Sequence, residues 1–414
     1  MRRRRGGTAL PREVGALAAV AFVVALGFGV VAPAIPLFAR SYGVGTTAVG
    51  LAVSAFAFFR FVSAFAGGAL VERAGERTVL TAGLVIVAVT TGAAGLAGSF
   101  PVFVALRGAG GLGSAMFTVA SLSLLLRTAP ADQRGRAAAT YQGGFILGGI
   151  AGPGAGGFLT EVSPRLPFFV YAGFLLVAGA VALVFLRPRP GQHPTPAGDP
   201  VGPGLGASGG ADPAGARAPD PAGVRAALRS RAYVAALVAN LGVGWVLFGV
   251  RNSLVPLYVT EALGLTAAWA GAGLLAGSVA QALGLLRAGT LSDRWGRRPS
   301  LVLGSALATA SLVLLVLPPV TAVFLTSMAV FGLAASLLAS VPAAVVGDVS
   351  PARGGRVVAV FQMVADFGAI TGPLVAGWLA DEMSYQWAFG VSAGVVGLAL
   401  VAALRMPRTI RPVG

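Results

Sequence analysis

Residues 289–298 read GTLSDRWGRR, and residues 68–77 read GALVERAGER. The two stretches carry glycines, a carboxylate and arginines at matching places, and they lie 221 residues apart. Each one separates two long apolar runs. A motif that returns after about half of a chain indicates that the fold is built from two related halves.

The composition predicts an integral membrane protein. Of the 414 residues, 56% are hydrophobic and only 11% are charged, whereas soluble proteins carry about 25% charged residues. The mean hydropathy is +0.84. In lipid, a single segment can satisfy its backbone hydrogen bonds only as a helix, so we predict an all-α fold. The 61 glycines fit that fold, because small residues let membrane helices approach closely.

Twelve apolar runs are long enough to cross a bilayer, which takes about 20 helical residues. We predict spans at 14–38, 47–70, 78–98, 101–126, 137–160, 166–186, 232–258, 267–288, 300–318, 320–346, 356–380 and 385–405. They form two six-helix bundles, within residues 1–186 and 232–414. Residues 187–231 between them are rich in Pro, Gly and Ala, so we expect a disordered cytoplasmic linker with a short helix around 224–231.

The arginines predict the orientation. Most of them precede the first span or fall in every second loop, whereas the opposite loops receive Arg40 and Arg165. Cytoplasmic loops carry an excess of basic residues, so both termini are expected in the cytoplasm, as an even number of spans requires. The Ala/Gly/Arg bias and the absence of Lys suggest a bacterial plasma membrane. We expect a monomer.

The halves match at further places with an offset of 220. The matching positions are Pro36 and Pro256, Arg136 and Arg356, Gln142 and Gln362, and Gly152-Pro153 and Gly372-Pro373. Such internal repeats are typical of secondary transporters, whose substrate site lies between the repeats near the bilayer midplane.

Several functions are excluded by what the chain lacks. It has no Cys, no Lys and a single His, His193. A nucleotide-binding P-loop needs a Lys, and a zinc site needs several His or Cys ligands. We therefore expect no metal, no cofactor and no enzyme. The net charge of +16 raises the alternative of nucleic-acid binding, but arginines placed between apolar runs are better explained as membrane-topology charges.

These motifs resemble the major facilitator superfamily, and the resemblance covers nearly the whole chain. Residues 289–298 match that family's loop motif G-x-L-x-D-R-x-G-R-[RK], and residues 68–77 match it with Glu72 in place of the Asp and Glu76 in place of an Arg. The resemblance implies twelve helices and transport by alternating access. It also implies a conformational latch at these loops, which holds the halves closed on the cytoplasmic side. The latch residues would be Gly68, Glu72, Arg73, Gly75, Arg77, Gly289, Asp293, Arg294, Gly296, Arg297 and Arg298.

A second motif lies in the fifth span. Residues 148–157, GGIAGPGAGG, resemble a family pattern that is associated with proton-coupled drug exporters. Proline can kink a helix, and glycines four apart leave one face open to a neighbouring helix. The motif therefore indicates either a helix that can bend or close packing of helices, and the sequence supports both roles equally. The residues concerned are Gly148, Gly152, Pro153, Gly156 and Gly157, repeated loosely by Gly372 and Pro373.

Four charged residues lie well inside predicted spans, away from the span ends, where an ionisable group costs about 2.5–3.5 kcal/mol and is a functional candidate by default. Arg60 and Asp366 lie near the middle of spans that face each other in the resembling family, so a pair between them is plausible, as is separate solvation. Arg107 matches the family's span 4 arginine, implicated by resemblance in proton transfer. Arg251 has no counterpart in the first half.

These residues predict a secondary transporter that exports a small organic, drug-like or amphipathic molecule in exchange for protons, with Asp366 as the proton carrier and Arg60 and Arg107 beside it. Uptake or exchange of a small anionic metabolite is the alternative, and a non-transporting sensor or scaffold is a remote one. The candidates for the substrate cavity are Arg251, Tyr141, Gln142, Asn240, Trp245, Gln281 and Gln362. For each of the uncharged ones, an ordinary interhelical contact is an equally good explanation.

Overall fold

The computed structural model describes residues 10–130, 133–186, 221–349 and 354–407. In that part of the chain every regular element is a helix, and each predicted span is present, most of them several residues longer than predicted. The first half holds α1 (Arg12–Val31), α2 (Ala34–Arg40), α3 (Thr46–Ala74), α4 (Glu76–Gly95), α5 (Phe100–Thr128), α6 (Arg134–Val162) and α7 (Leu166–Phe185). The second holds α8 (Pro221–Arg229), α9 (Arg231–Val243), η2 (Gly244–Val250), α10 (Arg251–Leu257), η3 (Tyr258–Ala262), α11 (Ala267–Trp295), α12 (Arg297–Leu314), α13 (Thr321–Val349), α14 (Gly354–Glu382) and α15 (Tyr385–Leu404).

The span count agrees with the sequence. Among the described residues, 11 helical segments are long and apolar enough to cross a membrane. α12 is the twelfth long helix, and its two leading residues, Arg297 and Arg298, make it less apolar than the others. Of the predicted linker, residues 187–220 lie outside the described part of the chain, while α8 forms the short helix expected before span 7.

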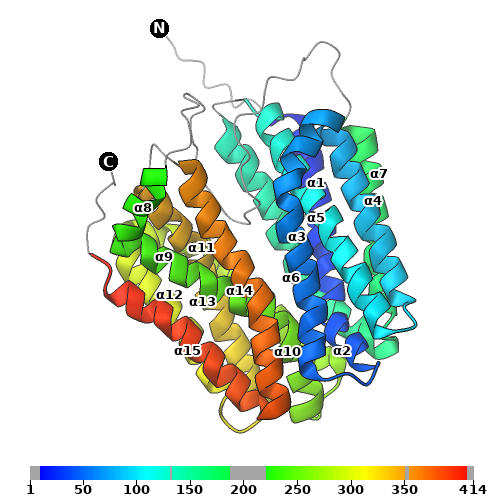
Figure 1. The fold of residues 1–414 in the computed structure, drawn as a ribbon, viewed down its shortest axis with the longest axis vertical. Helices are drawn as coiled ribbons and strands as arrows, with labels where there is room; N and C mark the ends of the chain where they lie inside the picture. The colour runs from blue at the N-terminus through cyan, green and yellow to red at the C-terminus, as the bar shows by residue number, and fades with distance from the viewer. Residues whose placement is uncertain (1–9, 131–132, 187–220, 350–353, 408–414) are drawn as a thin grey trace.

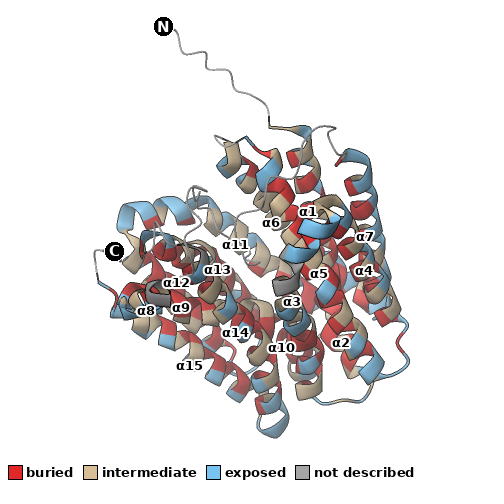
Figure 2. Cartoon of the chain, turned by 45° about the horizontal axis from the view of Figure 1, so that its top comes forward, coloured by how far each residue is buried: buried red, intermediate tan, exposed pale blue. Residues whose placement is uncertain are grey.

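The two halves stand side by side as helical bundles (Figure 1). We call the end where α1 begins and α3 ends the basic end, because it carries Arg12, Arg73 and Arg77. We call the other the opposite end. Each half has its own buried core. Large apolar side chains such as Leu286 and Leu96 lie on the outside, and buried and exposed positions alternate along the helices (Figure 2). This outward apolar surface is what lipid would cover.

The repeat seen in the sequence returns in the contacts. Arg77 donates to the carbonyl of Leu183, and Arg298 donates to the carbonyl of Leu404, with both partners displaced by 221 residues. Likewise, a Cβ placed on Gly29 would meet Cδ of Pro153 at 2.9 Å, and one on Gly249 would meet Cδ of Pro373 at 2.9 Å. Equivalent residues therefore make equivalent contacts in the two halves.

Span 7 departs from the repeat. The stretch from α9 to η3 contains two π-helical segments, η2 and η3, whereas its counterpart in the first half consists of two α-helices, α1 and α2, separated by a break at Ala32 and Pro33. At Gly244, where η2 begins, any Cβ would overlap the carbonyl oxygen of Ala365 on α14. π-Helical turns are rare and are often found at functional sites.

Candidate functional site

An ion pair joins the two halves near mid-span. Nη2 of Arg60, on α3, lies 3.0 Å from Oδ1 of Asp366, on α14, and the two side chains are only 18% and 10% exposed. The helices meet closely because Ser54 donates to the carbonyl of Ile370 at 2.6 Å and Gly50 lies directly against the Pro373 backbone. The pair that the sequence left open is therefore formed in this structure.

Protonation of Asp366 would change this contact. Two opposite charges at close range offset each other's burial cost, and removal of either one leaves an unpaired charge. A proton on Asp366 would remove its negative charge and weaken its bond to Arg60. Because each residue belongs to a different half, that change acts directly on the contact between the halves.

Arg107 lies on α5 in a buried position next to the same helix α3. Its guanidinium carbon is 4.7 Å from the centroid of the Phe56 ring, and its Nε has no hydrogen-bond partner in the structure. The neighbouring glycines let α5 approach: a Cβ on Gly108 would lie 2.7 Å from the Phe59 ring. The structure thus places the motif arginine beside the helix that carries Arg60, held by an aromatic ring.

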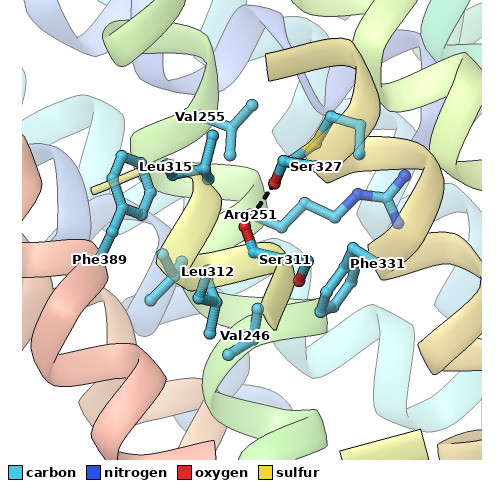
Figure 3. A pocket seen from close by; sticks show the side chains of 11 residues that line it. Val246, Arg251, Val255, Ser311, Leu312, Leu315, Ser327, Phe331 and Phe389 are labelled. Atoms are coloured by element: carbon cyan, nitrogen blue, oxygen red, sulfur yellow. Dashed lines mark hydrogen bonds between the residues drawn. The ribbon is translucent and has the colours of Figure 1, made fainter. Parts of the chain in front are cut away.

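Arg251 lies inside the second half. Its Nη2 donates to the Leu274 carbonyl at 2.8 Å and to Oγ of Ser278 at 3.2 Å, both on α11. Figure 3 shows it in a small pocket with Phe331 and Ser327, and all residues that line this pocket belong to the second half. The space there is no larger than a single water molecule needs. The structure therefore does not place Arg251 in a central cavity.

The uncharged candidates fall into two groups. Asn240 donates to the Phe361 carbonyl at 2.7 Å and Trp245 donates to Oγ of Ser392 at 3.1 Å, so both make contacts within the second half. The other four, on the helices that form the inter-half contacts, are half-buried. These are Tyr141 and Gln142 on α6, Gln281 on α11 and Gln362 on α14.

The glycines of the fifth span pack helices together. A Cβ on Gly148, Gly152 or Gly156 would collide with backbone atoms of α1. Gly157 faces the other half, where a Cβ would lie 2.8 Å from the Ala267 carbonyl oxygen. Pro153 lies within α6, and Gly372 and Pro373, the equivalents of Gly152 and Pro153, pack on the span 7 helix in the same way. Close packing is therefore present, and the bending role stays a prediction.

At the basic end the latch residues bind within their own half. Nη1 of Arg297 lies 2.7 Å from Oδ1 of Asp293, and its Nε lies 2.9 Å from Oδ2 of Asp348. Gly75 and Gly296 have φ of +79° and +96°, a backbone region that suits glycine, and each ends one helix and starts the next. Gly289 and Arg294 are exposed, and for Gly68 the structure describes only its place in α3.

The matching set in the first half differs from the prediction. Glu72 and Arg73 are exposed and form no ion pair among the described residues. Instead, Nη2 of Arg127 lies 3.2 Å from Oε2 of Glu76. Glu76 and Arg127 are the repeat equivalents of Arg297 and Asp348, so the same bridge is present with its charges exchanged. Glu76, which stands where the family motif has an Arg, is thus matched by an arginine, Arg127, at the end of α5.

We expect a double substitution that reverses the charges of Glu76 and Arg127 to restore the stability lost in each single variant. Glu76→Arg alone places two arginines together, and Arg127→Asp alone places two carboxylates together, so each should lower stability. The loss should be about 0.5–1 kcal/mol, since the Arg127 side chain is 43% exposed. The double variant should regain most of it. Thermal unfolding of the four proteins in detergent measures this, and a double variant as unstable as the sum of the singles would contradict it.

The opposite end carries contacts that the sequence reading missed. Nε of Arg40 lies 2.7 Å from Oε1 of Glu261, and the Tyr385 hydroxyl donates to Oε2 of Glu261 at 2.7 Å. Arg40 belongs to the first half, whereas Glu261 and Tyr385 belong to the second. From its loop position alone, Arg40 is explained as a topology charge. No sequence signal pairs them, because an offset of about 220 relates equivalent positions in the halves and does not show that they touch.

Two pseudo-symmetric bundles that meet across a mid-span ion pair define a secondary transporter. The family model of the Major Facilitator Superfamily matches residues 17–279 and 248–413, and the chain belongs to that family of membrane transporters. It is therefore not an enzyme.

Two curated relatives are similar in sequence. Quinolone resistance protein NorA of Staphylococcus aureus (strain MRSA252) is 31% identical over 178 residues, 42% of this chain and 45% of NorA. The match thus spans less than half of that relative. Multidrug resistance protein 1 of Bacillus subtilis (strain 168) is 24% identical over 395 residues, 94% of this chain and 95% of the relative.

The fold is also found in solved structures. A bacterial homologue of the human lysosomal transporter Spinster, in an inward-facing and unoccupied conformation, has a TM-score of 0.74 at 16% identity. The alignment covers 95% of this chain and 94% of that one. At this identity the likeness supports the fold alone.

Proposed function

We propose that this protein exports small organic molecules, drug-like or amphipathic, in exchange for protons. The observation that carries the proposal is the ion pair between Arg60 and Asp366, which bridges the halves with both side chains largely buried. Asp366 is the carboxylate and Arg60 the partner that is freed when a proton binds. Arg107, buried next to α3, keeps the local potential positive and favours proton release.

The conformation supports this cycle. The excess of arginines in every second loop supports a basic end that faces the cytoplasm of a bacterial cell. The inter-half contacts described above, from Arg60–Asp366 to Arg40–Glu261, lie between mid-span and the opposite end. We therefore take this conformation as the one that opens towards the cytoplasm, ready to load an export substrate. The protein acts as a monomer, since each chain contains both halves.

The substrate class follows from the relatives and from the interface helices. Relatives named for resistance to quinolones and to multiple drugs suggest planar, amphipathic substrates. Tyr141, Gln142, Gln281 and Gln362 offer one aromatic ring and three amides on α6, α11 and α14. Such a site takes molecules with a flat apolar body and a few polar groups.

A second candidate is the uptake or exchange of a small anionic metabolite. Arg107 favours it, because this arginine is buried and its Nε has no hydrogen-bond partner in the structure. The proton-coupled exporter is preferred, because the ion pair at the contact between the halves is explained by it directly.

Transport in proteoliposomes tests the choice. We expect an imposed pH gradient to drive accumulation of a fluoroquinolone against its concentration gradient, at least fivefold over protein-free vesicles, with collapse on adding a protonophore. Counterflow of labelled substrate without a proton gradient measures substrate binding and exchange independently of proton coupling. Exchange of a small organic anion without any effect of the pH gradient would favour the second candidate and reject the first.

A further inference from the structure

Two helices at the opposite end are capped by the other half of the protein. The N-terminus of a helix leaves backbone N–H groups without partners, and a side chain of the preceding residue usually accepts from them. The residue before α3 is Gly45, which has no side chain, and the residue before α11 is Thr266, whose side chain makes no capping bond. In both cases a carboxylate from the other half takes that place.

Asp381, on the last turn of α14, caps α3. Its Oδ1 accepts from the Thr46 N–H at 2.7 Å, and its Oδ2 accepts from the Thr47 N–H and hydroxyl, both at 2.7 Å. The fit depends on Gly45, because a Cβ there would lie 2.8 Å from Oδ2 of Asp381. Helix N-termini favour negative charge, so the carboxylate suits this position.

Glu161, on the last turn of α6, does the same for α11. Its Oε1 accepts from the Ala268 N–H at 3.2 Å. Glu161 and Asp381 are repeat equivalents at an offset of 220, and their target residues Thr47 and Ala268 are equivalents at 221. The two caps therefore form a symmetric set around the contact between the halves, with the stronger one on the α3–α14 side.

We propose that Asp381 and Glu161 are gating residues of the transport cycle: each closes the opposite end by capping a helix of the other half and must release it for that end to open. This rests on the proposed alternating-access function and adds residues that neither the motifs nor the ion pair assign. Two carboxylates of α14 bind α3, Asp381 at the end and Asp366, through Arg60, at mid-span. A proton on Asp366 alone thus leaves the end cap in place.

The geometry also allows the contact between Asp381 and α3 to break and form again. Asp381 is exposed, so water can solvate both the carboxylate and the freed N–H groups of α3 when the contact breaks. Loss of an end cap commonly changes an equilibrium by roughly two- to thirtyfold. The cap is therefore strong enough to bias the closed state and weak enough to be released in each cycle.

The test uses the fact that the chain has no cysteine. Spin labels at Ser99→Cys and Val320→Cys would report the distance between the halves, since both positions are exposed at the opposite end, one in each half. In the purified protein without substrate, we expect Asp381→Ala to raise the population with a long distance by roughly two- to thirtyfold. Glu161→Ala should raise it less. Glu382→Ala is the matched control, as this neighbouring exposed carboxylate makes no contact among the described residues.

A second variant guards against misfolding of the first. Gly45→Ala keeps the Asp381 carboxylate, but the added Cβ would push that carboxylate away from the N-terminus of α3. This variant should therefore raise the same long-distance population. Unchanged distance distributions in both Asp381→Ala and Gly45→Ala, matching Glu382→Ala, would overturn the proposal. Because the measurement needs neither substrate nor a pH gradient, a failure of drug transport would not affect it.

Discussion

Replacement of Asp366 by Asn is expected to abolish transport driven by a pH gradient. The substitution keeps the size of the side chain and removes the group that takes up the proton. Asn can still accept a hydrogen bond from Arg60, so the contact of α3 with α14 should persist. In proteoliposomes, we expect gradient-driven accumulation to fall at least tenfold, to the level of protein-free vesicles, while counterflow of labelled substrate continues.

The controls separate coupling from folding. Arg60→Gln leaves the Asp366 carboxylate without its partner inside a span and should lower the amount of folded protein. Combining it with Asp366→Asn removes both charges, so folding should recover while coupling stays absent. Glu382→Gln, a carboxylate change outside the span interior, should transport normally. An Asp366→Asn protein that retains full gradient-driven accumulation would exclude this residue as the coupling site.

Replacement of Gly156 by Val is expected to prevent stable folding of the first half. A Cβ at this position would overlap the carbonyl oxygen of Val30, so α6 and α1 must move apart. Overpacking of a tight contact costs about 1–3 kcal/mol, and a clash against backbone lies at or above the upper end. We expect little or no folded protein in detergent, measured by fluorescence-detected size-exclusion chromatography.

Gly149 provides the matched control. It lies on the same helix, and a Cβ there would meet nothing within 4 Å. Gly149→Val should therefore yield folded protein at close to the normal level, even though it places the same side chain in the same motif. Equal yields of the two variants would show that the motif glycines are not required for close packing.

The sequence predicted the twelve helices well because length and apolarity are local properties of the chain. The ion pair between Arg60 and Asp366 was also within reach, since the repeat and the family resemblance bring their spans together. The partner of Glu76 was not, because Arg127 is 51 residues away and only the fold brings the end of α5 to the start of α4. In the first half the carboxylate lies on Glu76 and the arginine at Arg127, the reverse of Arg297 and Asp348 in the second half. The motif alone shows only that Glu76 replaces an arginine, which suggests a less basic loop.

Arg251 shows a different limit of sequence reading. A residue can be assigned to a helix face only when the turns before it have a regular period of 3.6 residues. The π-helical segment η2 lies immediately before Arg251 and changes that period, so the side chain enters the second half and not the space between the halves. Asp381 and Glu161 were missed for another reason: charges at the ends of spans have an ordinary explanation in solvation.

The pair of Arg40 and Glu261 has an evolutionary consequence. Neither charge is repeated in the other half: the residues 220 after Arg40 and 220 before Glu261 are Thr260 and Ser41. The bridge therefore has no symmetric copy, and each half supplies a charge that the other lacks. A dimer of two identical half-size chains would form the same contact twice, once on each side of its two-fold axis. The single bridge is thus a contact that took its present form only after the two halves had diverged.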